Sequence, residues 1–309
     1  MHPFSQSRTG SVAALGEEKF ILAIRRWLGT ASPRAPFGIG DDCAVLAPSR
    51  GRQLITVDPV IYGRHFDDAI SPQAVAGKLL KRNLSDLAAM GGRPVAAVLA
   101  LTLDAKVSIA WLEKFYRGLA ASARQFDVAI VGGDIAQADG ALAASLTLLG
   151  EATGARVLTR TGAKVGDAIY VTGVLGGSLR SGHHFRFMPR LAEGRWLARR
   201  DEVRAMMDVS DGLAKDLHAL TPPAARPALD AVALPRRRGA DLRAALTDGE
   251  DYELVFAVAR RANPGEFSHA WHRAFPRTKL SRIGHFAPAG QLPADALNLD
   301  DYRGYEHLQ

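Results

Sequence analysis

Amphipathic helical segments alternate with short apolar runs along all 309 residues, and this mixture limits the possible folds more than any other feature of the sequence. Apolar residues at helical spacing predict helices over 17–28, 74–90, 111–126, 195–207, 213–220 and 240–246. Short apolar runs predict strands over 44–47, 54–58, 95–103, 128–131, 141–151, 168–172, 229–234, 252–258 and 280–286. Because both halves of the chain mix helices and strands, the fold class is α/β (α+β).

The length of the chain favours two domains over one. A single compact core seldom serves 309 residues, whereas two domains of about 150 residues each are ordinary. We place the boundary after the strand predicted to end at residue 151. The expected domains are therefore 1–153 and 154–309.

Composition excludes several classes of protein. Hydrophobic residues make up 47% of the chain and charged residues 23%, as in ordinary globular proteins. The single cysteine, Cys43, excludes an internal disulfide and a zinc site built from cysteines. The longest apolar stretches, such as 95–101, are too short to span a bilayer, and the first residues do not read as a secretory signal. We expect a cytoplasmic protein with no membrane partner.

The net charge of +7 leaves three kinds of partner open: nucleic acid, phosphate-rich ligands, or none. The basic residues occur in short groups, such as 25–26, 199–200 and 236–238, rather than in one long run. No zinc finger, aromatic RNA-binding motif or long basic helix accompanies them. We therefore expect no nucleic-acid partner, and a basic nucleic-acid-binding protein stays an alternative.

Aspartates recur where apolar runs give way to small residues. Six segments carry them: GIGDD (38–42), ITVD (55–58), NLSD (83–86), VGGD (131–134), DVSDG (208–212) and DGEDYE (248–253). We interpret each as an acidic turn after an apolar element. Carboxylate oxygens are the ligands that Mg²⁺ prefers, and gathered carboxylates repel one another unless cations lie between them. A lone aspartate in a turn is usually structural, so the pattern leaves a metal site and ordinary turns both open.

Standard catalytic and nucleotide-binding motifs are missing from the sequence. It contains no P-loop, no GxGxxG after a strand, no protein-kinase motif set, no GxSxG elbow and no HExxH helix. A bound nucleotide would need another scaffold. His183 and His184 are adjacent and cannot face one metal from a helix, so we expect them to have surface or packing roles.

Taken in order, the acidic segments and their flanks resemble the thiamine-monophosphate kinase family, within the superfamily that includes aminoimidazole ribonucleotide synthetase. The motifs that carry the resemblance are GIGDDCAVL (38–46), GRHF (63–66), KLLKRNLSDLAAMGGRP (78–94), IVGGD (130–134), LTRTGAKVGDAIYVTG (158–173), DVSDGL (208–213) and GEDYELVF (249–256). They extend over nearly the whole chain. The resemblance implies a two-domain aminoimidazole ribonucleotide synthetase-like fold and a homodimer that pairs through its N-terminal sheets.

The resemblance also implies an activity, namely direct in-line transfer of the ATP γ-phosphoryl group to thiamine monophosphate, with Mg²⁺. It implies metal ligands at Asp42, Thr56, Asp58, Asp86, Asp134, Asp208 and Asp211. It implies ATP contacts at Tyr116, Gly133, Asp134, Arg160 and Ser210, and substrate contacts at His65, Glu250 and Tyr305. Asp134, Asp211 and Arg160 are the residues expected to take part in catalysis.

Some positions depart from the family pattern. Val57 stands where a second hydroxyl residue is usual, Pro59 follows Asp58, and Ile135 replaces a frequent threonine. The connection over 176–184 is shorter than is common. Two alternatives therefore stay open: a related ATP-dependent enzyme that acts on another phosphate ester, and a non-catalytic nucleotide-binding protein.

Overall fold

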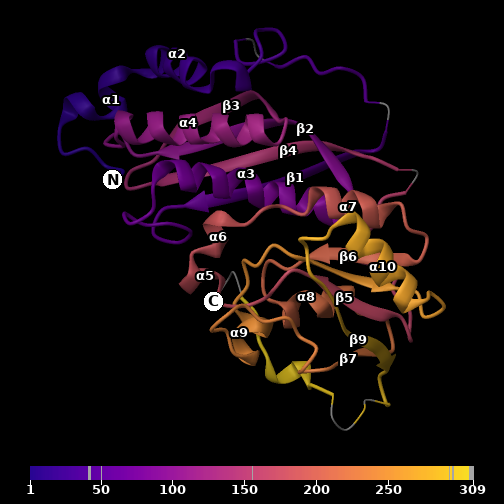
Figure 1. The fold of residues 1–309 in the computed structure, drawn as a ribbon. Helices are drawn as coiled ribbons and strands as arrows, with labels where there is room; N and C mark the ends of the chain where they lie inside the picture. Colours follow the sequence, from indigo (N-terminus) through magenta and orange to yellow (C-terminus); the bar gives the residue numbers. More distant parts are fainter. Residues whose placement is uncertain (41–42, 50, 155, 292, 294–295, 306–309) are drawn as a thin grey trace. The chain divides into compact units, whose positions relative to one another are not determined.

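The structure is a computed structural model that describes residues 1–309 except 41–42, 50, 155, 292, 294–295 and 306–309 (Figure 1). The chain divides into two compact units. Unit 1 comprises Met1–Leu87 and Arg93–Glu151, and unit 2 comprises Ala88–Gly92 and Ala152–Gln309. Each unit contains its own sheet.

Unit 1 contains a four-stranded sheet in the order β1-β4-β2-β3. Its strands are β1 (Gln53–Ile61), β2 (Gly92–Leu103), β3 (Ala129–Gln137) and β4 (Leu142–Ala152). β1 pairs antiparallel with β4, and β2 pairs parallel with β3. The strand order places β1 and β3 at opposite edges of the sheet. The helices are α1 (Val12–Leu15), α2 (Glu17–Leu28), α3 (Pro72–Ala89) and α4 (Ile109–Gln125), with 3₁₀ turns η1 (Arg8–Gly10) and η2 (Gly29–Ala31).

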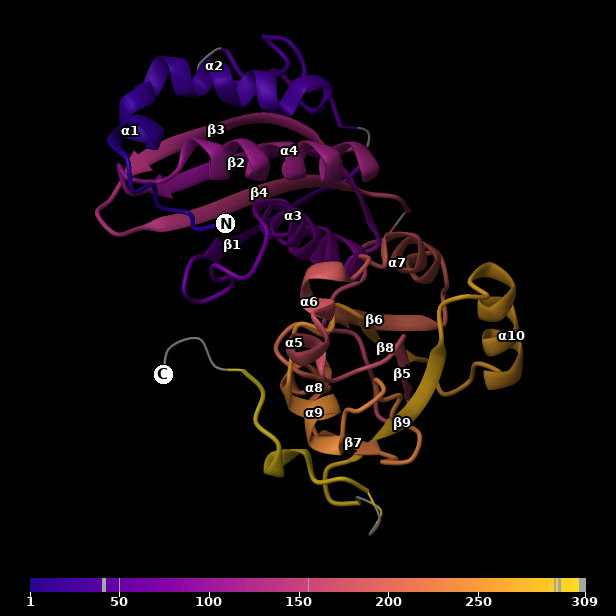
Figure 2. The ribbon, with the colours of Figure 1, turned by 60° about the vertical axis from the view of Figure 1, so that its left-hand side comes forward.

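Helix α4 shows how the sequence builds this unit. The Ser108 hydroxyl accepts a hydrogen bond from the Trp111 amide and caps the first turn. Trp111 and Phe115 then recur on one face, are buried, and stack with centroids 5.4 Å apart. Helices α3 and α4 lie against the same face of the sheet, with α2 beside α4 (Figure 2). The aromatic face of α4 thus supplies much of the core of unit 1.

The other face of the unit 1 sheet carries exposed apolar side chains. Along β1, Ile55 is 71% exposed and Val57 is 59% exposed, and Ile61 and Val98 on the same sheet are also exposed. Residues that alternate with such positions, such as Leu99 and Leu101 of β2, are buried. The sheet therefore has one packed face and one apolar face that this chain leaves open to solvent.

Unit 2 contains a five-stranded sheet in the order β6-β8-β5-β9-β7, with antiparallel pairing throughout. Its strands are β5 (Ala168–Thr172), β6 (Val203–Asp208), β7 (Ala225–Leu229), β8 (Leu254–Val258) and β9 (Leu280–Pro288). Its helices are α5 (Ser178–Ser181), α6 (His183–Arg186), α7 (Leu191–Ala198), α8 (Leu213–Leu220), α9 (Leu242–Thr247) and α10 (Pro264–Ala274), with the 3₁₀ turn η3 (Leu299–Asp301).

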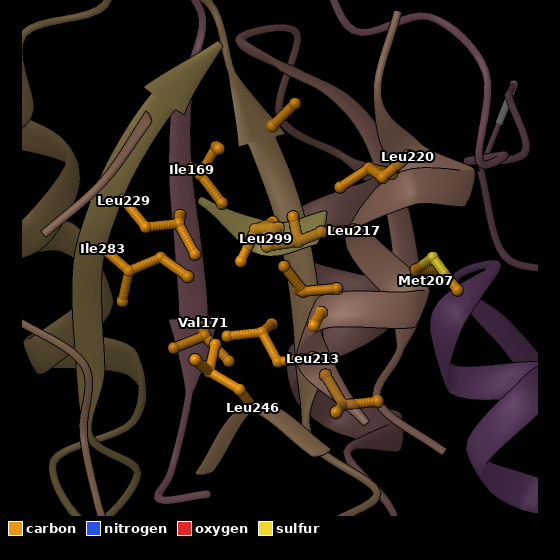
Figure 3. Close-up of a cluster of buried hydrophobic side chains, with 14 of the residues drawn as sticks. Ile169, Val171, Met207, Leu213, Leu217, Leu220, Leu229, Leu246, Ile283 and Leu299 are labelled. Atoms are coloured by element: carbon orange, nitrogen blue, oxygen red, sulfur yellow. The ribbon is translucent and has the colours of Figure 1, made fainter. Parts of the chain in front are cut away.

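Both faces of the unit 2 sheet are buried. Ile169 and Val171 of β5 pack with Leu213 and Leu217 of α8 and Leu246 of α9 (Figure 3). The alternate residue of β5, Tyr170, packs with Phe256, Phe267 and Trp271 on the other face, where α7 and α10 lie. Full burial of such large apolar side chains contributes roughly 1.5–3 kcal/mol each. This two-sided packing explains why β5 and β8 read as continuous apolar runs.

Several elements differ from the sequence prediction. No strand forms at 44–47, and the predicted helix over 195–207 was wrong beyond α7, because β6 occupies Val203–Asp208. Ala205, Met206 and Met207 favour helices, but pairing with β8 overrides that preference. β7 lies at Ala225–Leu229 rather than 229–234, and α10 was not predicted. Across the part of the chain that the structure describes, no helix is both long and apolar enough to cross a membrane.

Candidate functional site

Three of the predicted acidic turns are not turns. Asp58 lies within β1, Asp86 within α3, and Asp134 within β3. The paired glycines before Asp134 explain the error, because they read as a turn but serve the parallel pairing of β3 with β2. A Cβ atom on Gly133 would lie 2.1 Å from the carbonyl oxygen of Leu99, so this position needs glycine for backbone clearance.

Three of the predicted metal ligands gather where β1 meets α3. The Thr56 hydroxyl donates to the Asp86 carboxylate at 2.5 Å. One turn earlier on α3, Arg82 forms an ion pair with Asp58 at 3.1 Å and donates to the carbonyl of Pro59. This edge of unit 1 therefore offers a hydroxyl and two carboxylates beside a guanidinium.

A cavity of about 520 Å³ lies among α2, α4 and β3. Three predicted ATP contacts line it, namely Tyr116, Gly133 and Asp134. Its apolar walls come from Ile21, Ile24, Leu28, Ile39, Leu99 and Ile130. Burial raises the pKa of the Tyr116 hydroxyl, so this side chain stays neutral at physiological pH. The volume and the aliphatic walls suit a small organic ligand with a flat ring.

The sheet order separates the acidic residues of unit 1. Asp58 on β1 and Asp134 on β3 lie on opposite edges, with β4 and β2 between them. Among the residues that the structure describes, no group of three or more histidine, cysteine, aspartate or glutamate side chains is arranged to hold a metal ion. Asp42 lies outside the described residues. Within unit 1, His65 accepts a hydrogen bond at Nδ1 from the amide of Ile61, and its role as a substrate contact stays a prediction.

In unit 2, three of the predicted site residues, Asp208, Ser210 and Asp211, lie at the end of β6 and in the loop that follows it. Asp208 is buried at the end of the strand. The Asp216 carboxylate, from the first turn of α8, accepts hydrogen bonds from the amides of Ser210 and Asp211 at 3.0 and 3.1 Å. Burial raises the pKa of Asp216 to about 7, and the charge of Asp211 adds to this, whereas those amides and the nearby positive charge of Arg160 oppose it. Arg160 directly follows Thr159, whose carbonyl accepts a hydrogen bond from the Met206 amide of β6 at 3.0 Å.

The C-terminal segment returns to the same loop. The Tyr305 amide donates to the Asp211 carbonyl at 2.9 Å. Lys215 Nζ lies 2.9 Å from the Asp211 carboxylate and also donates to the Tyr305 carbonyl at 2.5 Å. The fold thus places the predicted substrate contact Tyr305 beside the predicted metal ligand Asp211.

The DGEDYE segment lies directly against the loop after β6. The Glu250 amide donates to the Ser210 carbonyl, and the Tyr252 amide donates to the Val209 carbonyl, both at 2.8 Å. A predicted substrate contact, Glu250, and a predicted ATP contact, Ser210, are therefore joined by a backbone hydrogen bond. Glu250 and Tyr252 adopt left-handed conformations, with φ of 52° and 53°. Residues held in such conformations are typical of functional sites.

Sequence reasoning missed Lys215, Asp216 and Asp251. Lys215 and Asp216 follow the DVSDG motif by one turn of helix, a spacing that brings their side chains back to the loop. Asp251 lies inside the GEDYE motif, where we assigned a role only to Glu250. The signal available in the sequence was thus a charged residue within or just after a motif already singled out.

Comparison with known proteins first defines the class. Residues 40–152 match the family model for the N-terminal domain of AIR synthase related protein. A hydrogenase maturation protein HypE in complex with ATP has the same fold, with a TM-score of 0.69 at 19% identity over 92% of both chains. Residues 40–152 therefore match the AIR synthase related class, and the two-unit fold is shared with HypE.

The family follows from nearer relatives. The thiamine-monophosphate kinases of Salmonella typhimurium and Escherichia coli are each 36% identical to this chain, over 88% of it and 91% of their own length. The crystal structure of thiamine-monophosphate kinase from Stenotrophomonas maltophilia K279a is 32% identical, with a TM-score of 0.75 over 86% of this chain and 93% of that one. AaThiL complexed with AMPPCP and TMP has a TM-score of 0.69 at 26% identity, over 96% and 98% of the two chains. This chain belongs to the thiamine-monophosphate kinase family.

Proposed function

We propose that this protein phosphorylates thiamine monophosphate to thiamine diphosphate with ATP as the phosphoryl donor. The observation that carries the proposal is the backbone hydrogen bond between Glu250 and Ser210, the expected contacts for the acceptor and the donor. A rigid link between two substrate-binding loops is what positioning for direct transfer requires. Family membership and the relative complexed with AMPPCP and TMP support the same reaction.

The cavity of unit 1 would hold part of the nucleotide. Its aliphatic walls and the buried Tyr116 ring offer stacking and apolar contact to a flat base. Gly133 brings the backbone of β3 close to the cavity without a side chain, and Asp134 follows at its rim. These features support ATP contacts at all three residues.

The acceptor needs no strong general base, because a phosphate ester is already largely anionic near neutral pH. The main barrier is repulsion between two polyanions, so positive charge has to lie between them. Arg160, near the loop after β6, would neutralise phosphate oxygens as charge builds up. Ser210 and Glu250 would hold the two substrates in line for transfer.

A magnesium site is part of the proposal. The hydroxyl of Thr56 and the carboxylate of Asp86 are hard oxygen donors that already lie 2.5 Å apart, a donor set that suits this ion. Because Asp58 and Asp134 lie on opposite edges of the sheet, more than one ion would be needed. Thr56, Asp58 and Asp86 would hold one ion, and Asp42, Asp134, Asp208 and Asp211 are proposed as ligands of others. When bound, Mg²⁺ neutralises phosphate oxygens during transfer.

A homodimer is also part of the proposal, with the exposed apolar sheet face of unit 1 as the interface. Ile55, Val57 and Ile61 of β1 lie on this face at the edge of the sheet, with Val98 of β2 on the same side. A row of exposed apolar side chains on an edge strand is typical of a surface that pairs with another chain. We place this dimer and its reaction in the cytoplasm.

The decisive experiment measures ADP release with thiamine monophosphate, with and without Mg²⁺, and identifies the product. The proposal expects ADP and thiamine diphosphate in equal amounts, only when Mg²⁺ is present. ADP release with another phosphate ester but not with thiamine monophosphate would identify a different acceptor. ATP binding with no ADP release for any acceptor would instead indicate a non-catalytic nucleotide-binding protein.

A further inference from the structure

The DGEDYE segment holds an unfavourable backbone conformation that its surroundings must offset. Gly249, Glu250 and Tyr252 all have positive φ, at 70°, 52° and 53°. For residues other than glycine this conformation is unfavourable. The left-handed backbone at Glu250 sets the direction of its side chain, so whatever stabilises this turn also controls a proposed substrate contact.

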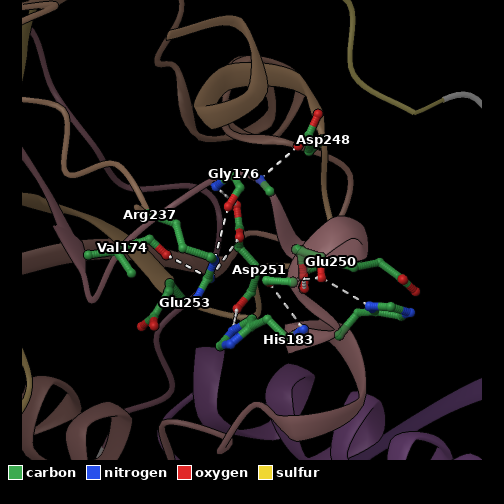
Figure 4. A network of polar contacts seen from close by, with 12 residues as sticks. Val174, Gly176, His183, Arg237, Asp248, Glu250, Asp251 and Glu253 are labelled. Atoms are coloured by element: carbon green, nitrogen blue, oxygen red, sulfur yellow. Dashed lines mark hydrogen bonds and ion pairs between the residues drawn. The ribbon is translucent and has the colours of Figure 1, made fainter. Parts of the chain in front are cut away.

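The buried Asp251 carboxylate forms the central contact of the turn (Figure 4). Asp251 is only 1% exposed, and its two oxygens accept hydrogen bonds from the Gly176 amide at 2.8 Å and from Arg237 at 3.3 Å. Arg237 also donates to the carbonyls of Gly176 and Val174. Asp251 and Arg237 thus enclose the glycine-rich turn that follows β5.

Two further hydrogen bonds join the same segments. The Asp248 carboxylate accepts from the Gly177 amide at 2.7 Å, and the Ser178 hydroxyl donates to the Glu250 carbonyl at 2.6 Å. Gly176 itself has no room for a side chain, because a Cβ atom there would lie 2.6 Å from the Ala245 amide nitrogen. The two segments are therefore fixed to each other on both sides of Glu250.

Glu250 and Asp251 are neighbours with different environments. Asp251 is buried in the network, whereas Glu250 is partly exposed and accepts a hydrogen bond from the Tyr252 hydroxyl at 3.3 Å. Figure 4 shows the two side chains pointing in different directions. The Asp251 carboxylate thus anchors the turn, while the Glu250 carboxylate is directed outward.

We propose that Asp251, held by Gly176 and Arg237, is a positioning residue that fixes Glu250 for the acceptor substrate. The inference rests on the proposed function, because it assigns Glu250 to thiamine monophosphate. Asp251 itself lies beneath the turn and acts through Glu250. Replacing its carboxylate removes the acceptor for Gly176 and Arg237 and frees the turn to relax out of the left-handed conformation.

The chain offers a closely matched control in Asp167. Like Asp251, it is 1% exposed and lies near an arginine, Arg204, at 3.6 Å. Its carboxylate accepts two hydrogen bonds, both from backbone amides, those of Lys164 and Arg260. Asp167 lies just before β5, and its carboxylate contacts Lys164, Arg204 and Arg260, which all lie outside the turns at 176–178 and 248–253. Asp167→Asn therefore reproduces the loss of a buried carboxylate in the same unit without touching the proposed anchor.

The experiment measures KM for each substrate, kcat and Tm for the wild type and for Asp251→Asn, Asp251→Ala, Arg237→Lys and Asp167→Asn. We expect KM for thiamine monophosphate to rise about tenfold or more in the Asp251 variants, while KM for ATP stays within about twofold. Arg237→Lys should give a smaller rise, because lysine lacks the planar fork. Asp167→Asn should lower Tm and leave both KM values unchanged.

A double variant tests the link to Glu250 directly. If Asp251 acts through Glu250, Glu250→Gln combined with Asp251→Asn should raise KM for thiamine monophosphate little beyond Glu250→Gln alone. Unchanged KM in the folded Asp251 and Arg237 variants, or equal changes for both substrates, would overturn the positioning role while the activity stands. A wild-type protein that releases no ADP with thiamine monophosphate would overturn the proposed function and the positioning role together.

Discussion

The two sheets of this molecule differ in how their apolar faces are covered. In unit 2, alternate residues of β5 pack into two separate hydrophobic cores, one on each face of the sheet. Helices of the same chain therefore cover both faces. In unit 1, α3 and α4 cover one face only, and the other presents Ile55, Val57, Ile61 and Val98 to solvent. Unit 2 is complete as a single copy, whereas the exposed sheet of unit 1 favours pairing with a second molecule.

The two units also carry different parts of the candidate site. Unit 1 carries the cavity and the group formed by Thr56, Asp58 and Asp86, which rest on strands and helices. Unit 2 carries Ser210, Asp211 and Glu250 on loops that are held together by backbone hydrogen bonds. Helices and strands therefore position the candidate site residues of unit 1, whereas hydrogen bonds between loops position those of unit 2.

The largest effect is expected from a cavity in the doubly covered sheet. Phe256→Ala in β8 removes a fully buried ring and should lower the free energy of unfolding by about 3–5 kcal/mol. Ile55→Ala on the open face of unit 1 should cost less than about 0.5 kcal/mol in dilute protein. Urea unfolding at several protein concentrations measures both changes. A large loss for Ile55→Ala in dilute protein would contradict the difference between the sheets.

Next come the acidic residues, one from each unit. Asp134→Asn and Asp211→Asn should each reduce turnover at least about 100-fold, because each removes a charge expected to hold Mg²⁺ near the phosphates. Both side chains are at least partly exposed, so the fold should survive, as circular dichroism would verify. Steady-state ADP release measures the effect, and near-normal turnover in both variants would refute the metal assignment.

A smaller effect is expected on self-association. Val57→Lys places a charge on the open face of unit 1 and should weaken dimer formation at least about tenfold. Val232→Lys is the matched control, because Val232 is 88% exposed in a loop of unit 2. Analytical ultracentrifugation compares the two. Equal association of both variants and the wild type would remove this face from consideration as the interface.

The last effect concerns pH and the network of unit 2. Burial raises the pKa of Asp251 to about 7, against the lowering effects of the Gly176 amide and Arg237. The folded state therefore holds this proton more tightly than the unfolded state, and the contribution is complete below about pH 4 and is lost as pH rises towards 7. Between these values, wild type should lose up to about 1.4 kcal/mol per pH unit relative to Asp251→Asn. Unfolding at pH 4.5, 5.5 and 6.5 tests the slope, and parallel curves would contradict it.

Sequence patterns predicted the elements whose packing is regular. α2 and α4 follow from their buried stripes, and β5 and β8 follow from runs that are buried on both faces. β6 was misread because its alanine and methionine residues favour helices, and only its pairing with β8 decides otherwise. α10 was missed because its buried apolar residues are only Phe267 and Trp271, too few for a clear period.

For the candidate site, motifs supplied the residues but not their surroundings. Asp251 accepts from Gly176, 75 positions away in sequence, and Tyr305 contacts a loop more than ninety positions earlier. Almost every residue type carries a backbone amide donor, so the sequence gives no pattern that links these pairs. The contact between the Ser210 and Glu250 loops was hidden for the same reason.

The glycine at position 133 has a consequence for how related chains are interpreted. A Cβ atom here would clash with the Leu99 carbonyl of the neighbouring parallel strand, so even alanine would push β3 away from β2. A descendant that had lost all catalytic activity would still have to keep this glycine in order to fold. Retention of the glycine at 133 is therefore a signature of architecture, and an inactive relative has to be recognised by the loss of the acidic residue that follows it.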